Sequence, residues 1–205
     1  MEQADRVIPV ANLTEYFRDS LDTVMAERKL RAEDDTAHYV VNLLTEFARS
    51  EALYEQTEAG LGLKPLAFML ADAVEAESVH QRQQSLQRLG DVALFVAGFF
   101  AGSLARSLVD VDYYINMGGN AYGSLSQSHG GSLRVQARAS IFAELGQKFG
   151  DFVDALSDIA EQGRQDHDVL RQYEIWLRTG SVRAENILRS LGIVPDSSAG
   201  IDYRH

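Results

Sequence analysis

The chain has 205 residues, a formal net charge of −11 and 45% apolar residues, with three prolines and no cysteine. The lack of cysteine excludes a disulfide scaffold, a thiol nucleophile and a thiolate-bound metal. The acidic balance argues against nucleic acid and membranes as partners, because binding to nucleic acid or to an anionic membrane rests on basic patches. Because the apolar fraction is large enough for a core, the sequence predicts a soluble globular domain.

The N-terminal half follows a helical repeat of about 3.6 residues. Residues 1–30 show no basic start followed by an apolar run, so we expect no signal peptide and a cytoplasmic location. Asn12 and Glu15 have the spacing of a capping box, which predicts a first helix there. A second helix is expected to begin near Asp34 or Asp35. Residues 60–65 are predicted to be a connector whose final proline opens the next helix.

The central helix of the predicted fold runs from Val79 to Arg106, after a second capping box that begins at Ser78. The segment 92–105 contains no charged residue. At 1.5 Å per residue it spans about 21 Å, which is less than the ~30 Å hydrocarbon core of a bilayer. We therefore expect a core helix that is surrounded by others and does not enter a membrane.

The C-terminal half is also expected to be helical. One helix is predicted to begin near Asp112, and a second, long helix is predicted to cover 133–162. Residues 166–195 are predicted to form a helical hairpin, and residues 196–205 a flexible tail. The sequence thus predicts an all-α fold, with a bundle of about six or seven helices around a central apolar helix. Residues 1–195 are assigned to one domain, to which the hairpin could be an appendage.

Three pairs of glycines lie four residues apart inside predicted helices. They are Gly98 and Gly102, Gly119 and Gly123, and Gly146 and Gly150. An interior glycine costs about 1 kcal/mol relative to alanine, so a compensating role is needed. Close helix crossings offer one, since two glycines on a face let another backbone approach. Kinks, helix ends and a ligand groove are the alternatives, and the tandem Gly118–Gly119 is the expected break.

Two carboxylate–histidine pairs have the spacing that di-iron helical bundles use, Asp35 with His38 and Glu77 with His80. Both pairs lie at predicted helix starts, where capping residues are expected, and they lie off the apolar stripes. We therefore expect no bound metal and no cofactor. The sequence contains no Gly-x-Ser-x-Gly elbow, Walker loop or Gly-x-Gly-x-x-Gly motif, so no catalytic residue is assigned.

Residues 110–129 stand apart because they combine uncharged polar and aromatic side chains without any Glu, Lys or Arg. The candidate ligand or interface residues are Tyr113, Tyr114, Asn116, Asn120, Tyr122 and His129. Tyrosine is favoured at interfaces because it joins an apolar ring to a polar tip. Three interpretations stay open: a buried helix with internally paired polar groups, a protein or homo-oligomer interface, and a ligand or catalytic pocket.

Two function hypotheses follow from these features. The leading one is a non-enzymatic helical interaction or regulatory protein that acts as a homodimer. The alternative is a small-molecule-binding protein or enzyme with a pocket lined by tyrosine, asparagine and histidine of 110–129.

Overall fold

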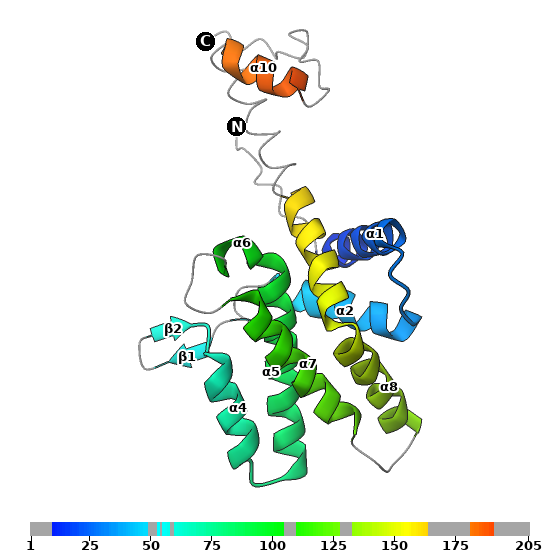
Figure 1. Ribbon diagram of the computed structural model, residues 1–205, viewed down its shortest axis with the longest axis vertical. Helices are drawn as coiled ribbons and strands as arrows, with labels where there is room; N and C mark the ends of the chain where they lie inside the picture. The colour runs from blue at the N-terminus through cyan, green and yellow to red at the C-terminus, as the bar shows by residue number, and fades with distance from the viewer. Residues whose placement is uncertain are drawn as a thin grey trace. The chain divides into compact units, whose positions relative to one another are not determined.

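The computed structural model describes residues 10–48, 53, 55–57, 60–104, 110–127, 133–163 and 181–190. This part of the chain is α-helical apart from one short β-hairpin, which confirms the all-α fold class (Figure 1). The chain divides into two compact units, Met1–Ile159 and Ala160–His205. The single domain predicted for 1–195 stays a prediction.

In chain order, the elements are α1 (Val10–Arg28), α2 (Asp34–Phe47), β1 (Glu55–Thr57), β2 (Gly60–Gly62), α4 (Leu66–Glu75), α5 (Val79–Phe99), α6 (Ala101–Leu104), α7 (Val111–Ser126), α8 (Leu133–Gln147), a helix over 149–163 and α10 (Val182–Ser190). Only α10 of the labelled elements belongs to the second unit. It is the one described helix of the predicted C-terminal hairpin, whose remainder lies outside the described residues, as does the tail 196–205.

Local capping chemistry sets several helix starts. Ser78 precedes α5 with an extended backbone, and its Oγ accepts a hydrogen bond from the backbone N–H of Gln81 over 3.2 Å. This confirms the predicted helix start with Ser78 as its cap; the Gln81 side chain accepts from Ser78 Oγ over 3.2 Å. The predicted start of α2 at Asp34 is also confirmed. At α1 the expectation was wrong: α1 covers Val10–Arg28, so Asn12 lies inside the helix and does not cap it.

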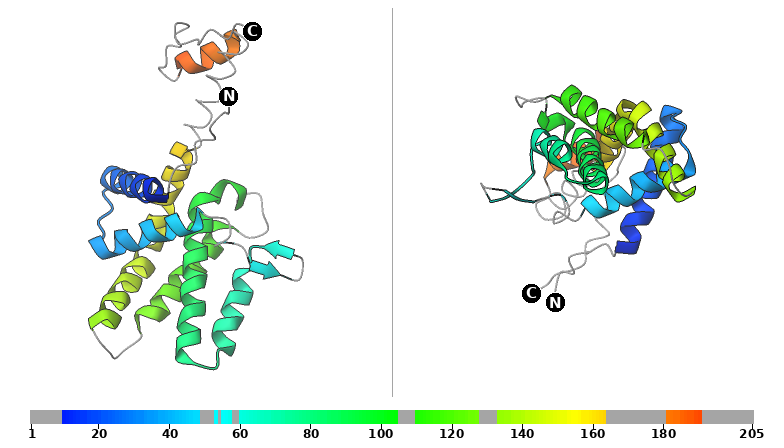
Figure 2. Two further views of the ribbon diagram at one scale, coloured as in Figure 1. Left: turned by 180° about the vertical axis from the view of Figure 1, so that it is seen from behind. Right: turned by 90° about the horizontal axis from the view of Figure 1, so that it is seen from below.

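The core of the first unit forms around the second half of α5. From Leu89 to Gly98 the helix is buried at every position except Asp91. α4 and α7 pack along α5, α8 packs on α7, and α2 contacts both α5 and α8. The views in Figures 1 and 2 agree that α4, α5 and α7 lie side by side. Two residues of α5, Asp91 and Gly98, are therefore surrounded by other helices.

Two long helices predicted from periodicity are interrupted. The helix predicted over Val79–Arg106 ends at Phe99, because the backbone of Phe100 (φ −117°, ψ 17°) leaves the helical range, and α6 follows separately. Arg106 lies outside the described residues. The helix predicted over 133–162 is divided at Lys148, although hydrogen bonds from Lys148 N to Glu144 O and from Phe152 N to Lys148 O run through the junction.

Two other expectations also need correction. The tandem Gly118–Gly119 does not break a helix, since α7 continues through both residues. The predicted connector over 60–65 starts with a strand: β2 pairs antiparallel with β1, with Gln56 opposite Leu61. No local pattern in Gly-Leu-Gly indicates a strand, because its hydrogen-bond partner is the segment that precedes it.

Two glycines of the predicted pairs lie at close contacts between helices. A Cβ atom at Gly98 would lie 2.4 Å from Leu156 Cβ, and one at Gly146 would lie 3.1 Å from the backbone N of Gly123. The first contact joins α5 to the helix over 149–163, and the second joins α8 to α7. The first distance is shorter than a real Cβ contact, so a side chain there would force a shift, whereas the second is tight and would need a small one.

Among the described helices, none combines the length and the apolar character that a bilayer crossing requires.

Candidate functional site

Asp91 is the one charged residue within the buried stretch of α5. It precedes Leu94 by three residues and Phe95 by four, so it shares their helix face. Both of those side chains are buried. A carboxylate at such a position needs hydrogen-bond donors around it, because burying an unpaired charge is very unfavourable.

Two tyrosines supply those donors from other helices. Tyr39 of α2 and Tyr122 of α7 each donate a phenol hydrogen bond to the same oxygen, Asp91 Oδ1, over 2.6 Å. Tyr122 is completely buried, and its ring stacks on Phe142 of α8 with centroids 5.5 Å apart. The carboxylate therefore ties α2 and α7 to α5.

Gly90 makes room for one of these tyrosines. A Cβ atom at Gly90 would lie 2.6 Å from Tyr122 Cε1, closer than real contacts allow. Any larger residue at position 90 would push the Tyr122 ring away from α5 and lengthen its bond to Asp91.

A chain of hydrogen bonds leads from Asp91 to the surface. Gln87 Nε2 donates to Tyr39 Oη over 2.9 Å, and Gln87 Oε1 accepts from Arg138 Nη2 over 2.7 Å. Arg138 is exposed and lies on α8. Four helices thus contribute to one polar network, which we call the Asp91 network (Asp91, Tyr39, Tyr122, Gln87 and Arg138).

Burial dominates the electrostatics of this network. It raises the pKa of Asp91 to about 6, against the opposing effects of hydrogen bonds from Tyr122 and Tyr39 and of the charge on Arg88. The charge of Glu46 adds to the rise. Burial and the adjacent Asp91 carboxylate raise the pKa values of Tyr39 and Tyr122. Both phenols therefore remain protonated donors, while Asp91 can exchange a proton near neutral pH.

Asp91 keeps some exposed surface along a groove between α2 and α5. The groove has a volume of about 430 Å³ and is lined by Tyr39, Asn42, Leu43, Glu46, Phe47, Gln84, Gln87, Arg88 and Asp91. The guanidinium of Arg88 lies 5.0 Å from the Phe47 ring centroid and donates to the carbonyl of Leu53 over 3.1 Å. Arg88 thereby covers one side of the groove.

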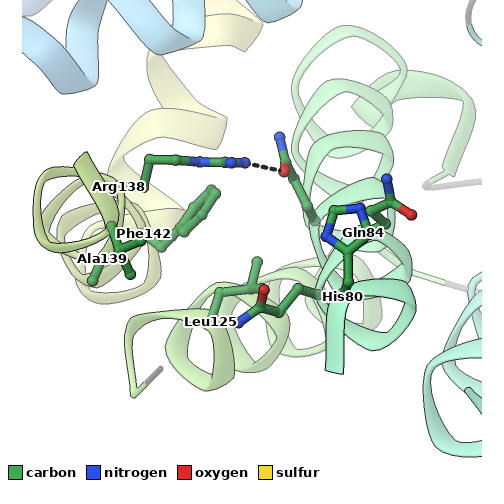
Figure 3. Close-up of a pocket in the computed structure, with 9 residues that line it drawn as sticks. His80, Gln84, Leu125, Arg138, Ala139 and Phe142 are labelled. Atoms are coloured by element: carbon green, nitrogen blue, oxygen red, sulfur yellow. Dashed lines mark hydrogen bonds between the residues drawn. The ribbon is translucent and has the colours of Figure 1, made fainter. Parts of the chain in front are cut away.

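A second hollow lies between α5, α7 and α8 and shares Gln84 and Gln87 with the groove (Figure 3). It has a volume of about 110 Å³ and is lined by His80, Gln83, Gln84, Gln87, Leu125, Val135, Arg138, Ala139 and Phe142. Arg138 and Phe142 point from α8 toward α5, and Leu125 comes from α7 (Figure 3). We call it the Arg138 hollow.

The structure does not gather the six candidate residues of 110–129 at one place. Tyr122 belongs to the Asp91 network, whereas Tyr113 and Tyr114 are partly buried and contact each other edge-to-face with centroids 5.7 Å apart. Asn116 and Asn120 are exposed on α7. The sixth residue, His129, lies outside the described residues.

The carboxylate–histidine pairs lie at the surface. Asp35 and His38 are exposed on α2, and Glu77 and His80 are exposed around the start of α5. Among the described residues, no three His, Asp or Glu side chains come together as a metal site would require.

Asp91 directly precedes the uncharged segment 92–105 and is not among the candidate residues predicted from the sequence. A signal was available: Asp91 falls on the same helical face as Leu94 and Phe95. A lone acid on an apolar face indicates donors from neighbouring helices.

No protein-family model, curated protein or solved structure matches the chain. Functional inference therefore rests on the residues and surfaces described above.

Proposed function

We propose that the chain is a non-enzymatic interaction or regulatory protein that acts as a homodimer, with the outer face of α4 as its contact surface. The observation that carries this proposal is the exposure of large apolar side chains on that face. Phe68 is 61% exposed and Val74 is 77% exposed, and Val79 at the start of α5 is 74% exposed. Large apolar patches on soluble proteins commonly mark interaction sites.

The inner face of α4 is apolar as well. Leu66, Met69 and Ala73 are buried in the core, while α4 packs along α5. A helix that is apolar on both faces is typical of one covered on both sides. The outward-facing Phe68 and Val74, which lie about 120° apart around the helix, therefore have no apolar partner within the described part of the chain.

A second copy of the chain fits this face by charge. Lys64 precedes α4, and Glu75 is its last residue. Packed antiparallel about a two-fold axis, two α4 helices bring Lys64 of one chain near the partner's Glu75. Lys64 already pairs with Asp72 within the chain, so its side chain reaches the carboxylates of this helix. The chain has a net charge of −11, so two copies repel each other at most of their surfaces. A contact that pairs a lysine with a glutamate offsets this repulsion.

Sedimentation velocity over a wide range of protein concentration tests the proposal. We expect a reversible dimer that Phe68→Glu and Val74→Glu each convert to monomer, since a charge on the face leaves a buried ion unpaired in the dimer. Leu133→Glu is the matched control, because Leu133 is 84% exposed on α8 and should leave association unchanged. A wild-type chain that remains monomeric throughout, or a dimer unaffected by Phe68→Glu, would contradict the proposal.

The alternative function, a small-molecule-binding protein or enzyme with a pocket in 110–129, draws less support. Among the described residues of that segment, only Leu125 lines either of the hollows described above. Asn116 and Asn120 project from α7 at exposed positions. The cytoplasmic location expected from the sequence stays a prediction.

A further inference from the structure

The Arg138 hollow differs in charge from the rest of the chain. Among the described residues that line it, none is acidic, although the whole sequence carries 30 acidic and 19 basic residues. Its polar groups are side-chain amides, one imidazole and one guanidinium, and all of these can donate hydrogen bonds. The hollow therefore presents donors and a positive charge to any small molecule that enters it.

The Arg138 guanidinium has N–H donors that are available to a ligand. Its Nη2 bonds to Gln87 Oε1 over 2.7 Å, and its guanidinium carbon lies 5.8 Å from the Phe142 ring centroid. Within the described residues it pairs with no carboxylate. A guanidinium has five N–H donors, so an anion could bind the remaining ones in the bidentate manner that carboxylates favour. Gln87 and Phe142 hold the side chain in place before any ligand arrives.

The remaining surface of the hollow is apolar. Leu125, Phe142 and Ala139 form one wall opposite the α5 side chains, as Figure 3 shows. The volume of about 110 Å³ is smaller than the engineered cavity of about 150 Å³ that accommodates benzene in another protein. An aliphatic chain of a few carbon atoms suits this space better than an aromatic ring.

We propose that the Arg138 hollow binds a small aliphatic carboxylate, whose carboxylate pairs with Arg138 and whose hydrocarbon chain contacts Phe142 and Leu125. Gln87 positions the guanidinium, and through Tyr39 it connects the ligand site to the buried carboxylate of Asp91. The site involves α5, α7 and α8 and does not depend on the proposed dimer contact on α4.

Nuclear magnetic resonance of the full-length chain provides the test, with butyrate as the probe. We expect butyrate to shift the Arg138 Nε–H and Gln87 side-chain amide signals saturably, while 1-butanol and butylamine at the same concentrations do not. Arg138→Gln should weaken butyrate binding about tenfold or more, because it removes a charge-assisted hydrogen bond. The affinity of Arg138→Lys for butyrate should lie between those of the wild type and Arg138→Gln, since lysine keeps the charge but loses the bidentate geometry.

Arg134→Gln is the matched control, because Arg134 is exposed one turn earlier on α8 and does not line the hollow. It should bind butyrate like the wild type, and thermal melting should show that every variant is folded. Three results would overturn the proposal: no saturable shift, equal affinity for butyrate and 1-butanol, or butyrate binding that survives Arg138→Gln. Inorganic phosphate that binds as tightly as butyrate would also overturn it, because the apolar wall would then contribute nothing.

Discussion

Tyr122 donates its phenol hydrogen to Asp91 Oδ1 across 2.6 Å, and the two residues are 31 positions apart in the chain. The same oxygen accepts from Tyr39, 52 positions away in the other direction. One carboxylate oxygen therefore holds three helices in register, and its protonation state bears on the stability of the fold.

Asp91→Asn tests that link through the pH dependence of unfolding. Burial raises the pKa of Asp91 in the folded protein to about 6, so the folded state binds this proton more tightly than the unfolded chain. The resulting stabilisation is complete below the ordinary aspartate pKa and is lost as the pH rises through about 6. Asparagine keeps an oxygen that accepts both phenols but does not titrate. We expect the free energy of unfolding of Asp91→Asn, relative to wild type, to increase by about 1–3 kcal/mol between about pH 4 and about pH 8.

Chemical denaturation at a series of pH values measures this difference. Asp112→Asn serves as the control, because Asp112 is exposed on α7. Loss of net negative charge at low pH affects the wild type and both variants alike, so it cancels in the comparison. Parallel pH profiles for the wild type and Asp91→Asn would show that Asp91 has no raised pKa.

Tyr122→Ala should act on folding and leave association unchanged. The side chain is fully buried between Asp91 and Phe142, and removing a large buried aromatic ring typically costs about 3–5 kcal/mol. Tyr114→Ala should cost less, since Tyr114 is only partly buried. Thermal melting and sedimentation of both variants give the two readouts.

Tyr122→Phe covers the case in which Tyr122→Ala does not fold. It keeps the ring and removes only the hydroxyl, with an expected loss of about 1–3 kcal/mol. A dimer that dissociates in Tyr122→Phe at unchanged stability would instead favour the interface interpretation of 110–129.

Gly98→Ala should destabilise the fold. The added Cβ would lie 2.4 Å from Leu156 Cβ, so the two helices must separate. Overpacking of this kind typically costs about 1–3 kcal/mol and outweighs the gain of about 1 kcal/mol in helix propensity. Gly98→Leu should lower the free energy of unfolding further than Gly98→Ala. Denaturant unfolding measures both.

Gly123→Ala on α7 is the matched comparison for Gly98→Ala, because the same substitution is made in a helix at an open position. Its Cβ would meet nothing within 4 Å, so the propensity gain should appear as a stabilisation of about 0.5–1 kcal/mol. If Gly98→Ala were instead as stabilising as Gly123→Ala, the close crossing of α5 with the helix over 149–163 would be wrong.

Sequence reasoning succeeded where the determining chemistry is local. Ser78 marked a helix start because a cap acts within three residues, and Asp34 marked one because acidic residues suit the first turn of a helix. It failed where contacts with residues far away in the sequence determine the local structure. Gly118 looks like a helix break, yet a Cβ there would lie 2.2 Å from Phe149 Cζ, so this glycine serves a contact with a helix some thirty residues further on. Periodicity along one segment carries no information about that neighbour.

The same limit applies to the candidate site. The concentration of tyrosines in 110–129 drew attention to Tyr122, but its partner Asp91 lies on another helix and looked like a boundary residue. Composition indicates which side chains are unusual, whereas their roles depend on which face of the helix each occupies. Tyr122 and Asn120 are two positions apart, yet one is buried and the other exposed.

Arg28, the last residue of α1, bonds to Asp158 and Asp154 at positions 130 and 126 residues later in the chain. Because a chain is made from its N-terminus onward, α1 leaves the ribosome long before the carboxylates that receive its terminal arginine. This contact can therefore form only after the helix over 149–163 has been made. Nascent or truncated chains that end before residue 154 lack this closure, and we expect them to depend most on chaperones.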